Sequence, residues 1–357
     1  MATRRGFLAG LLVSGALPRL AWADVGGPAF LAAAKDAAGE YALHALSARG
    51  ESLFHLPLPG RGHAACAHPV RAEAVAFARR PGTFALVLDA GTGRELARLT
   101  PPEGRQFNGH GAYSADGSVL YTSEVVAQGS AGRVGLWDSE SWQRIGEWHS
   151  GGIGPHELRL RPEGGLVVAN GGIETDPEDR AKLNLEAMQP NLTWLDGIGG
   201  IVAQAALEPG LNKNSIRHLA LGPEGQVAFA MQWEGDPAEV VPLLGLCAAG
   251  ESPALCPPLE AEALLMQGYA GSIAWNRSVG RIVLTSPRGG VAMVFDGAGR
   301  PVASHRRADI CGAAALGDGF VLTDGGGAIW ALDDRGLSLL AQHALSWDNH
   351  LVALQTA

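Results

Sequence analysis

The sequence contains few cysteines and none of the cysteine motifs that hold a cofactor. There are 4 Cys among 357 residues. No CxxC or CxxCH occurs, which excludes a thioredoxin-type redox site and covalently attached c-type haem. Cys247 and Cys256 are near enough in sequence to close a short disulfide loop in an oxidising compartment. For Cys66 and Cys311, the favoured interpretation is two buried thiols.

Basic runs, long apolar segments and nucleophile motifs are also missing. The formal net charge is −9 and no Lys/Arg-rich run occurs, which argues against a nucleic-acid partner. Beyond the N-terminal region no segment is long and apolar enough to cross a membrane. No GxSxG nucleophile elbow is present. Glycine and proline are abundant instead, and 50 Gly with 21 Pro predict frequent turns.

The first 23 residues have the pattern of an export signal. A twin-arginine motif, Thr3-Arg4-Arg5-Gly6-Phe7-Leu8, precedes an apolar run through Leu17, and Ala21-Trp22-Ala23 offers small residues at cleavage-site spacing. The alternative is an uncleaved anchor, but the apolar run is short for a bilayer. We therefore expect a periplasmic protein, exported by the twin-arginine pathway, with no membrane contact after cleavage.

A histidine or small residue, a short strand, a turn and a second apolar strand recur along the chain. The instances are residues 107–122, 156–168 and 218–229, with weaker copies at 272–284 and 312–322. A second feature, an apolar pair followed by Asp and a turn, recurs at Asp89, Asp138, Asp196, Asp296 and Asp333. Each unit therefore has two turns and four strands, because each turn joins a pair of strands.

The repeat length predicts an all-β, seven-bladed propeller. Unit starts near His68, His110, His156, His218, Ser272, Gly312 and His350 are separated by 42, 46, 62, 54, 40 and 38 residues. A four-stranded propeller blade takes roughly 40–50 residues. Residues 40–58 look like the late half of a blade and residues 347–354 like an isolated first strand. Pairing the two would close the ring, which removes exposed strand edges.

We expect one propeller domain at residues 40–357, preceded by an N-terminal arm at 24–39 that is Ala-rich and could be a short helix. Insertions are expected near residues 173–193 and 234–265, where the units are longest. In the first insertion, the acidic stretch 176–179 predicts the start of a helix that Pro190 ends.

The candidate site is a set of histidines at equivalent places in the repeat. The innermost strands of a propeller surround its axis, so side chains at their starts converge. Several imidazoles on one axis would suit a transition metal such as iron or copper, and an adjacent carboxylate could join them. The predicted ligands are His110, His156, His218, His350 and Glu157, with His63 and His68 as further candidates. No catalytic residue is assigned.

Two further interpretations remain open at this stage, one for the histidines and one for an arginine. Propellers of the WD-repeat type carry a Gly-His pair whose histidine bonds within its own blade, and Gly109-His110 resembles that pair. Arg288, within the turn 286–290, could bind a carboxylate, although stabilisation of its own turn is the favoured interpretation.

Several sequence blocks resemble an uncharacterised family of bacterial periplasmic proteins, catalogued as a domain of unknown function. The blocks are residues 61–82, 151–173, 215–220, 286–290 and 311–313. The resemblance implies a twin-arginine-exported, seven-bladed propeller encoded near imelysin-type and di-haem peroxidase-like proteins of iron acquisition, which are the partners we expect. The family has no established catalytic residues to carry over.

Three functional hypotheses follow. The first is a periplasmic binding or accessory protein of iron or other transition-metal acquisition, using the channel face to hold a metal or dock a partner. The second is a metal-dependent hydrolase or oxidoreductase in the same channel, with a histidine as general base. The third is a protein-interaction scaffold, since the propeller fold alone does not specify a function.

Overall fold

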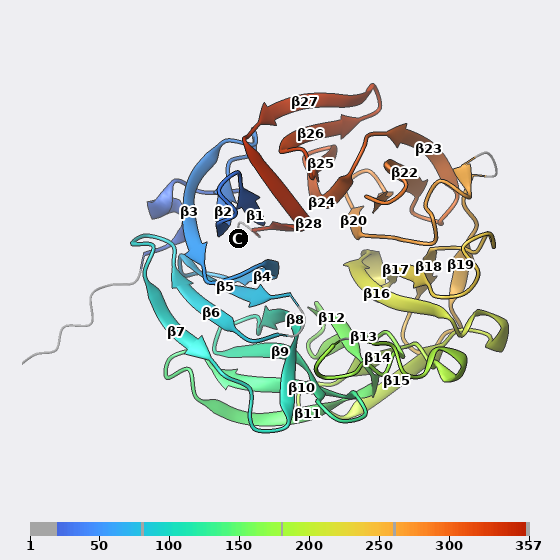
Figure 1. The fold of residues 1–357 in the computed structure, drawn as a ribbon, viewed down its shortest axis with the longest axis horizontal. Helices are drawn as coiled ribbons and strands as arrows, with labels where there is room; N and C mark the ends of the chain where they lie inside the picture. The colour runs from blue at the N-terminus through green and yellow to red at the C-terminus, as the bar shows by residue number, and fades with distance from the viewer. Residues whose placement is uncertain (1–19, 80–81, 180, 260–261, 355–357) are drawn as a thin grey trace, which may run out of the picture.

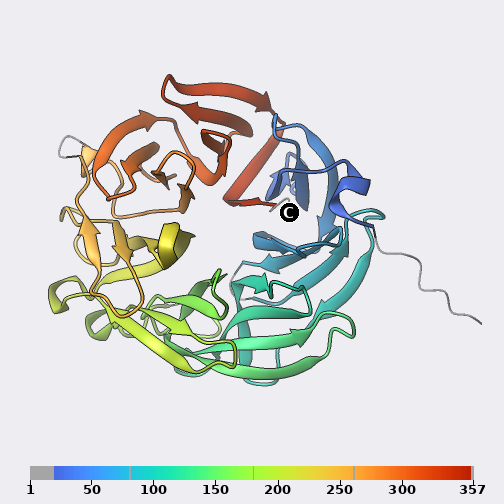
Figure 2. The same cartoon turned by 180° about the vertical axis from the view of Figure 1, so that it is seen from behind.

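In the computed structural model, the chain forms a ring of seven antiparallel sheets, each with four strands (Figures 1 and 2). The structure describes residues 20–354 except 80–81, 180 and 260–261. Neighbouring blades contact one another mainly through their innermost strands, which surround the axis. The predicted seven-bladed propeller is confirmed.

Each blade is named here by its innermost strand. From the axis outward, the strands are β28 (Leu345–Ala353), β1 (Phe30–Asp36), β2 (Tyr41–Leu46) and β3 (Ser52–Leu58); β4 (Gly62–Ala67), β5 (Glu73–Ala78), β6 (Ala85–Asp89) and β7 (Glu95–Leu99); β8 (Arg105–Tyr113), β9 (Val119–Val126), β10 (Ala131–Asp138) and β11 (Arg144–Ile153); β12 (Pro155–Leu160), β13 (Leu166–Asn170), β14 (Asn191–Leu195) and β15 (Ile201–Ala206). The remaining blades are β16 (Asn214–Leu221), β17 (Val227–Trp233), β18 (Leu244–Cys247) and β19 (Ala254–Cys256); β20 (Ser272–Asn276), β21 (Arg281–Ser286), β22 (Val291–Asp296) and β23 (Pro301–Arg306); β24 (Ile310–Leu316), β25 (Gly319–Asp324), β26 (Ala328–Asp333) and β27 (Gly336–Gln342).

The β28 blade closes the ring with strands from both ends of the chain. β28 pairs antiparallel with β1, so that Phe30 lies opposite Ala353. Closure by the two ends is confirmed, but the predicted boundary is wrong: residues 30–36 form β1 inside the blade rather than an arm outside it. Their first five side chains are buried, and this packing overrides the helix propensity of an Ala-rich segment. Outside the ring, the helical part is the 3₁₀ turn η1 (Trp22–Val25).

Apolar side chains fill the spaces between neighbouring blades, and aspartates close the outer turns. Val75 and Phe77 of the β4 blade pack in one cluster with Leu120 and Trp137 of the β8 blade. The predicted Asp turns are present, because each carboxylate accepts backbone N–H bonds from the residues that follow. Such bonds are made by Asp89, Asp138, Asp196, Asp296 and Asp333.

The two predicted insertions differ from the expectation in different ways. The first contains less helix than predicted, and the second contains two strands of its blade. In the described part of residues 171–190, which link β13 to β14, the helical segment is the short η2 (Leu185–Ala187); a helix does not begin at residues 176–179. The second insertion contains β18 and β19, the outer strands of its blade. Cys247 and Cys256 end these strands as buried, free thiols, and Cys66 and Cys311 are also buried and free. Two further 3₁₀ turns are η3 (Pro209–Leu211) and η4 (Pro223–Gly225).

The predicted export signal lies mostly outside the described residues, since the description begins at Leu20. From there the chain lies against the β4 blade: Leu20 accepts the N–H of Ala72, and the Trp22 indole donates to the carbonyl of His68 at 2.9 Å. Within the described residues, no helix has the length and apolar character needed to span a membrane. Export therefore stays a prediction.

Candidate metal centre

Each innermost strand that carries a histidine of the axis pairs irregularly with its neighbour. A β-bulge places extra residues on one strand and redirects side chains. In the β8 blade, Phe107 pairs with Glu124 and the next pair is Gly111 with Thr122, so residues 108–110 oppose one residue. The same kind of register shift occurs beside the histidines of β4, β12, β16 and β28. The two innermost strands without histidine differ from each other: β20 pairs continuously with β21, whereas β24 has a similar register shift between Ile310 and Ala313.

The five bulged strands bring five imidazoles together at the axis. Eight of the ten ring pairs within this histidine centre have centroids 4.5–5.8 Å apart. Two triads have one ring nitrogen from each member within 4.8 Å of the others. The members are His63, His110 and His350 in the first triad, and His110, His156 and His218 in the second. The histidines therefore face one another, which argues against the alternative in which each bonds within its own blade.

Burial favours the neutral form of four of these imidazoles and leaves several ring nitrogens without partners. Burial lowers the pKa of His63, and lowers the pKa values of His110, His156 and His350 well below 6.5. Among the described residues, no hydrogen-bond partner exists for buried Nε2 of His110, Nδ1 of His156 or Nε2 of His350. A buried, unpaired nitrogen is costly, and a neutral imidazole nitrogen is the form that coordinates a metal.

Two carboxylates lie beside histidines of the centre, one next to His218 and one next to His63. Glu157 Oε2 lies 3.4 Å from His218 Nδ1 and accepts the N–H of Leu219, while its other oxygen is 2.5 Å from Arg159 Nη2. Burial opposes ionisation of Glu157, but Arg159 and His218 more than offset it and lower its pKa. Metal-bound histidines commonly place their second nitrogen against such a carboxylate. This placement favours a supporting role for Glu157 over direct coordination.

Asp348 occupies the corresponding place beside His63. Its Oδ1 is 3.9 Å from His63 Nδ1, and its Oδ2 accepts a hydrogen bond of 2.6 Å from Arg61 Nε. Burial opposes ionisation, but His63 and Arg61 lower the pKa of Asp348 to about 2. The sequence alone did not single out Asp348 or Arg61, because their approach depends on closure of the ring.

Gly109 allows two histidines of the centre to approach. Its φ is +93°, a left-handed conformation that suits glycine. A Cβ at this position would lie 2.6 Å from Cδ2 of His63, on the neighbouring blade. The Gly-His pair seen in the sequence thus has a local explanation: the glycine gives room for His63, and the bulge turns His110 toward it.

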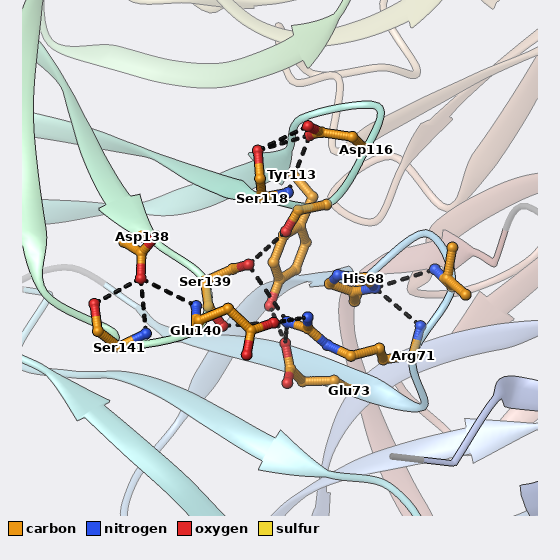
Figure 3. A network of polar contacts seen from close by, with 12 residues as sticks. His68, Arg71, Glu73, Tyr113, Asp116, Ser118, Asp138, Ser139, Glu140 and Ser141 are labelled. Atoms are coloured by element: carbon orange, nitrogen blue, oxygen red, sulfur yellow. Dashed lines mark hydrogen bonds and ion pairs between the residues drawn. The ribbon is translucent and has the colours of Figure 1, made fainter. Parts of the chain in front are cut away.

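His68 does not join the centre. It follows the end of β4, and its Nδ1 accepts backbone N–H bonds from Val70 and Arg71 at 3.1 and 2.9 Å. Figure 3 shows it in a polar network in which Arg71 contacts Glu73 and Glu140, and Tyr113 donates to Glu73 at 2.9 Å. The network ties the β4 blade to the β8 blade. The repeat therefore starts at His63 on its strand, not at His68.

The donor set of the centre fits a borderline transition metal. Imidazole nitrogens suit zinc, copper, iron and nickel, and oxygen-preferring ions such as calcium less well. A tetrahedral ion about 2.1 Å from each nitrogen separates two ligand nitrogens by about 3.4 Å. Since the triads are within 4.8 Å, their rings would turn toward a shared ion by roughly 1 Å. His110 belongs to both triads, so it is the common ligand of any such arrangement.

Comparison with solved structures supports the fold and nothing finer. Hydrazine synthase of Kuenenia stuttgartiensis is 13% identical with a TM-score of 0.60, over 95% of this chain and 99% of that chain. The U3-55K structure is 14% identical with a TM-score of 0.58, over 79% and 81% of the two chains. Sqt1 of Saccharomyces cerevisiae is 12% identical with a TM-score of 0.50, over 80% and 86%. At these identities, the likeness concerns the propeller alone.

The sequence also matches the model of a protein family. The family described as "Protein of unknown function (DUF1513)" matches residues 56–354, which include every member of the histidine centre. No curated protein matches the sequence significantly.

Proposed function

We propose that this chain, which belongs to the family of unknown function DUF1513, binds a transition-metal ion in its histidine centre. The observation that carries the proposal is the convergence of five imidazoles from five blades, in which eight of the ten ring pairs have centroids 4.5–5.8 Å apart. Such a cluster is costly to bury without a partner, and an ion would satisfy several nitrogens at once.

The ligand set favours a divalent ion. Neutral imidazoles supply no negative charge, and the nearest carboxylates, Glu157 and Asp348, lie behind His218 and His63 rather than within the triads. Among divalent ions, Cu²⁺ has the highest affinity for nitrogen sites, with Zn²⁺ and Fe²⁺ below it. Iron would therefore be held as Fe²⁺, and which ion fills the site in the cell depends on supply as well as affinity.

The surroundings favour binding over catalysis. A metal-dependent enzyme needs a free coordination position and an acid or base that reaches the substrate. Glu157 is the carboxylate next to the centre in sequence, and it is engaged by Arg159 and the Leu219 backbone. The proposal is therefore a metal-binding or accessory protein, and turnover of a substrate is an outcome that the test below must look for.

A place in periplasmic iron acquisition is the wider form of the proposal. Its support is the twin-arginine motif at residues 3–8 and the resemblance of the sequence blocks to proteins encoded beside imelysin-type and di-haem peroxidase-like proteins. In this setting, the protein would receive Fe²⁺ or Cu²⁺, or present it to one of these partners. Co-purification from periplasm with an epitope-tagged chain would test the partners independently of the metal.

The direct test is metal titration of the full chain after removal of bound ions with a chelator. We expect isothermal titration calorimetry with Cu²⁺, Zn²⁺ and anaerobic Fe²⁺ to give a Kd below about 1 µM for at least one ion. Replacement of His110, His156 and His218 by Ala should abolish this binding. His149→Ala is the matched control, because His149 is exposed on the outer strand β11.

Binding weaker than millimolar for every ion, or equal binding by the triple variant, would leave the protein as a scaffold. Steady turnover of ester, lactone or metal-oxidation substrates that requires His110 would instead identify an enzyme. In the expected outcome, the ion is taken up in a saturable way and no substrate is consumed.

A further inference from the structure

An open depression of about 510 Å³ lies beside the two blades that lack a histidine at the axis. One wall is the turn 287–290 between β21 and β22, and the other is the linker 306–309 between β23 and β24. Its size is within the range of small-molecule sites, roughly 300–1,000 Å³. It is therefore large enough for more than a single inorganic ion.

Three arginines line this depression on a chain whose net charge is −9. Arg288 and Arg306 are exposed and make no ion pair or hydrogen bond through their side chains to any residue that the structure describes. The Arg288 guanidinium lies over the ring of Tyr269, 4.3 Å from its centroid. These contacts do not support the interpretation that Arg288 stabilises its own turn. The N–H groups of its guanidinium therefore remain available to a ligand.

Arg307 is held in a defined position between the same walls. The side-chain Nε of Arg307 donates to Asp324 at 2.8 Å, and its guanidinium lies 4.5 Å from the ring centroid of Trp330. The backbone N–H of Arg307 donates to the carbonyl of Gly290. The last bond joins the linker to the turn. Nε is used by Asp324, so the Nη groups are the donors that a ligand would meet.

Each wall contains one residue with a sterically constrained backbone. A Cβ at Gly289 would lie 1.6 Å from the carbonyl oxygen of Leu265, so the turn is pressed against the preceding segment. Asp309 has φ +56°, a left-handed conformation that costs energy for a residue with a side chain. Strain of this kind is frequent at ligand sites, and a preformed site loses less entropy on binding.

One chain of contacts connects the depression to the histidine centre. Tyr269, under Arg288, accepts a hydrogen bond of 3.2 Å from Asn349, the residue before His350. Asp309 is the acidic residue among the lining residues, so the balance of charge on the walls is positive.

We infer that this depression binds a small polycarboxylate, with Arg288 and Arg306 as the charged donors and Arg307 as the fixed one. Guanidinium groups match the planar carboxylate bidentately. Because each of the two walls carries arginine, a ligand with at least two carboxylates could contact both walls at once. The volume of the depression is large enough for such a ligand. This site is separate from the histidine centre, and its ligand does not depend on the proposed metal function.

The test is calorimetric titration of the chelator-treated full chain at low ionic strength with tricarballylate, inorganic phosphate and acetate. Tricarballylate has three carboxylates and chelates metals weakly. We expect it to bind with a Kd below about 1 mM and at least tenfold more tightly than phosphate or acetate. Arg288→Gln and Arg306→Gln should each weaken its binding about tenfold, and higher salt should weaken it as well.

Arg335→Gln is the matched control, because this exposed arginine lies in the turn between β26 and β27, at the other end of its blade. It should leave tricarballylate binding unchanged, and so should His110→Ala, which separates this site from the metal proposal. Absence of binding, tighter binding of phosphate, or an equal loss with Arg335→Gln would each overturn the inference. Thermal melting checks that the arginine variants, all at exposed positions, remain folded.

Discussion

Among single residues, His110 has the largest expected effect on the proposed metal binding, because it is the one histidine common to both triads. An ion in either triad needs its nitrogen. His350 and His156 each belong to one triad only, so the other triad remains when one of them is removed. The ranking of the metal affinities of the single variants therefore reports which triad holds the ion.

We predict that His110→Ala weakens metal binding by more than the roughly 10–100-fold that loss of a supporting partner costs. One of His350→Ala and His156→Ala should have a comparable effect, and the other a small one. Calorimetric or competition titrations of the three variants measure this. Equal and small losses in all three would contradict a centre built on a shared histidine.

Gly109 is a second position where one residue type is required. Gly109→Ala should lower both stability and metal affinity, because the new Cβ strains a φ of +93° and meets His63 at 2.6 Å. We expect a loss of about 2 kcal/mol in the free energy of unfolding, measured by urea denaturation.

The matched control is Gly129→Ala. Gly129 has a similar φ of +81°, but no atom lies within 4 Å of the place that a Cβ would take there. This variant should carry the backbone strain and keep its metal affinity. If the two variants bind metal alike, the contact between Gly109 and His63 does not shape the centre.

At the scale of one blade, a buried network connects three strands of the β8 blade. Glu124 on β9 is fully buried and accepts hydrogen bonds from Arg144 on β11 at 2.8 Å and from Thr122 at 2.6 Å. Thr122 in turn accepts the indole N–H of Trp137 on β10 at 3.0 Å. Removing the carboxylate leaves Arg144 partly buried without its main partner.

We predict that Glu124→Ala destabilises the protein by about 3 kcal/mol, since loss of one partner in a buried ion pair is costly. Glu95→Ala, which breaks the exposed pair with Arg98, should cost less than about 1 kcal/mol. Urea denaturation of both variants measures the difference. Similar losses of unfolding free energy in the two variants would show that burial does not make the Glu124 ion pair more important for stability than the exposed one.

The β28 blade contains a group of histidines away from the axis. Burial lowers the pKa of His44 from 6.5 to about 4, and His55 and His343 add to the effect. His44 also contacts Trp347 and the Ser52 hydroxyl. Because the folded pKa is the lower one, the unfolded chain takes up this proton first as the pH falls. The contribution of neutral His44 to the free energy of unfolding is therefore complete above pH 6.5 and is lost as the pH falls toward 4.

His44→Gln should remove up to about 3 kcal/mol of the stability difference between neutral and acidic pH. The measurement is urea denaturation at about pH 7.5 and 4.5 with a chelator present. The exposed His149→Gln should retain the acid sensitivity of the parent. An unchanged acid loss in His44→Gln would show that the closing blade is not weakened by this protonation.

Across the whole molecule, the sequence predicted the architecture well because its signals are local. The Asp turns recur in five of the seven blades and the apolar strands recur in all of them, so blade number and closure followed from counting. Phe30–Asp36 was missed because an Ala-rich segment has helix propensity, and its pairing with β28 depends on the far end of the chain.

The site was predicted in part, for a physical reason. Four histidines at equivalent repeat positions, together with His63, do converge, since repeats place equivalent residues around one axis. His68 was grouped with them because it is close to His63 in sequence, and Glu157 was expected as a ligand because it follows His156. Bulges, glycine φ values and contacts across blades, which decide these details, depend on register and packing that a single sequence does not reveal.

The most direct measurement is a crystal structure of the full chain grown with the tightest-binding ion, with diffraction data on both sides of its absorption edge. We predict an anomalous peak at the propeller axis, about 2.0–2.3 Å from a nitrogen of His110 and from nitrogens of two further histidines of one triad. A fully occupied ion elsewhere on the protein, with no peak between these imidazoles, would contradict the central claim.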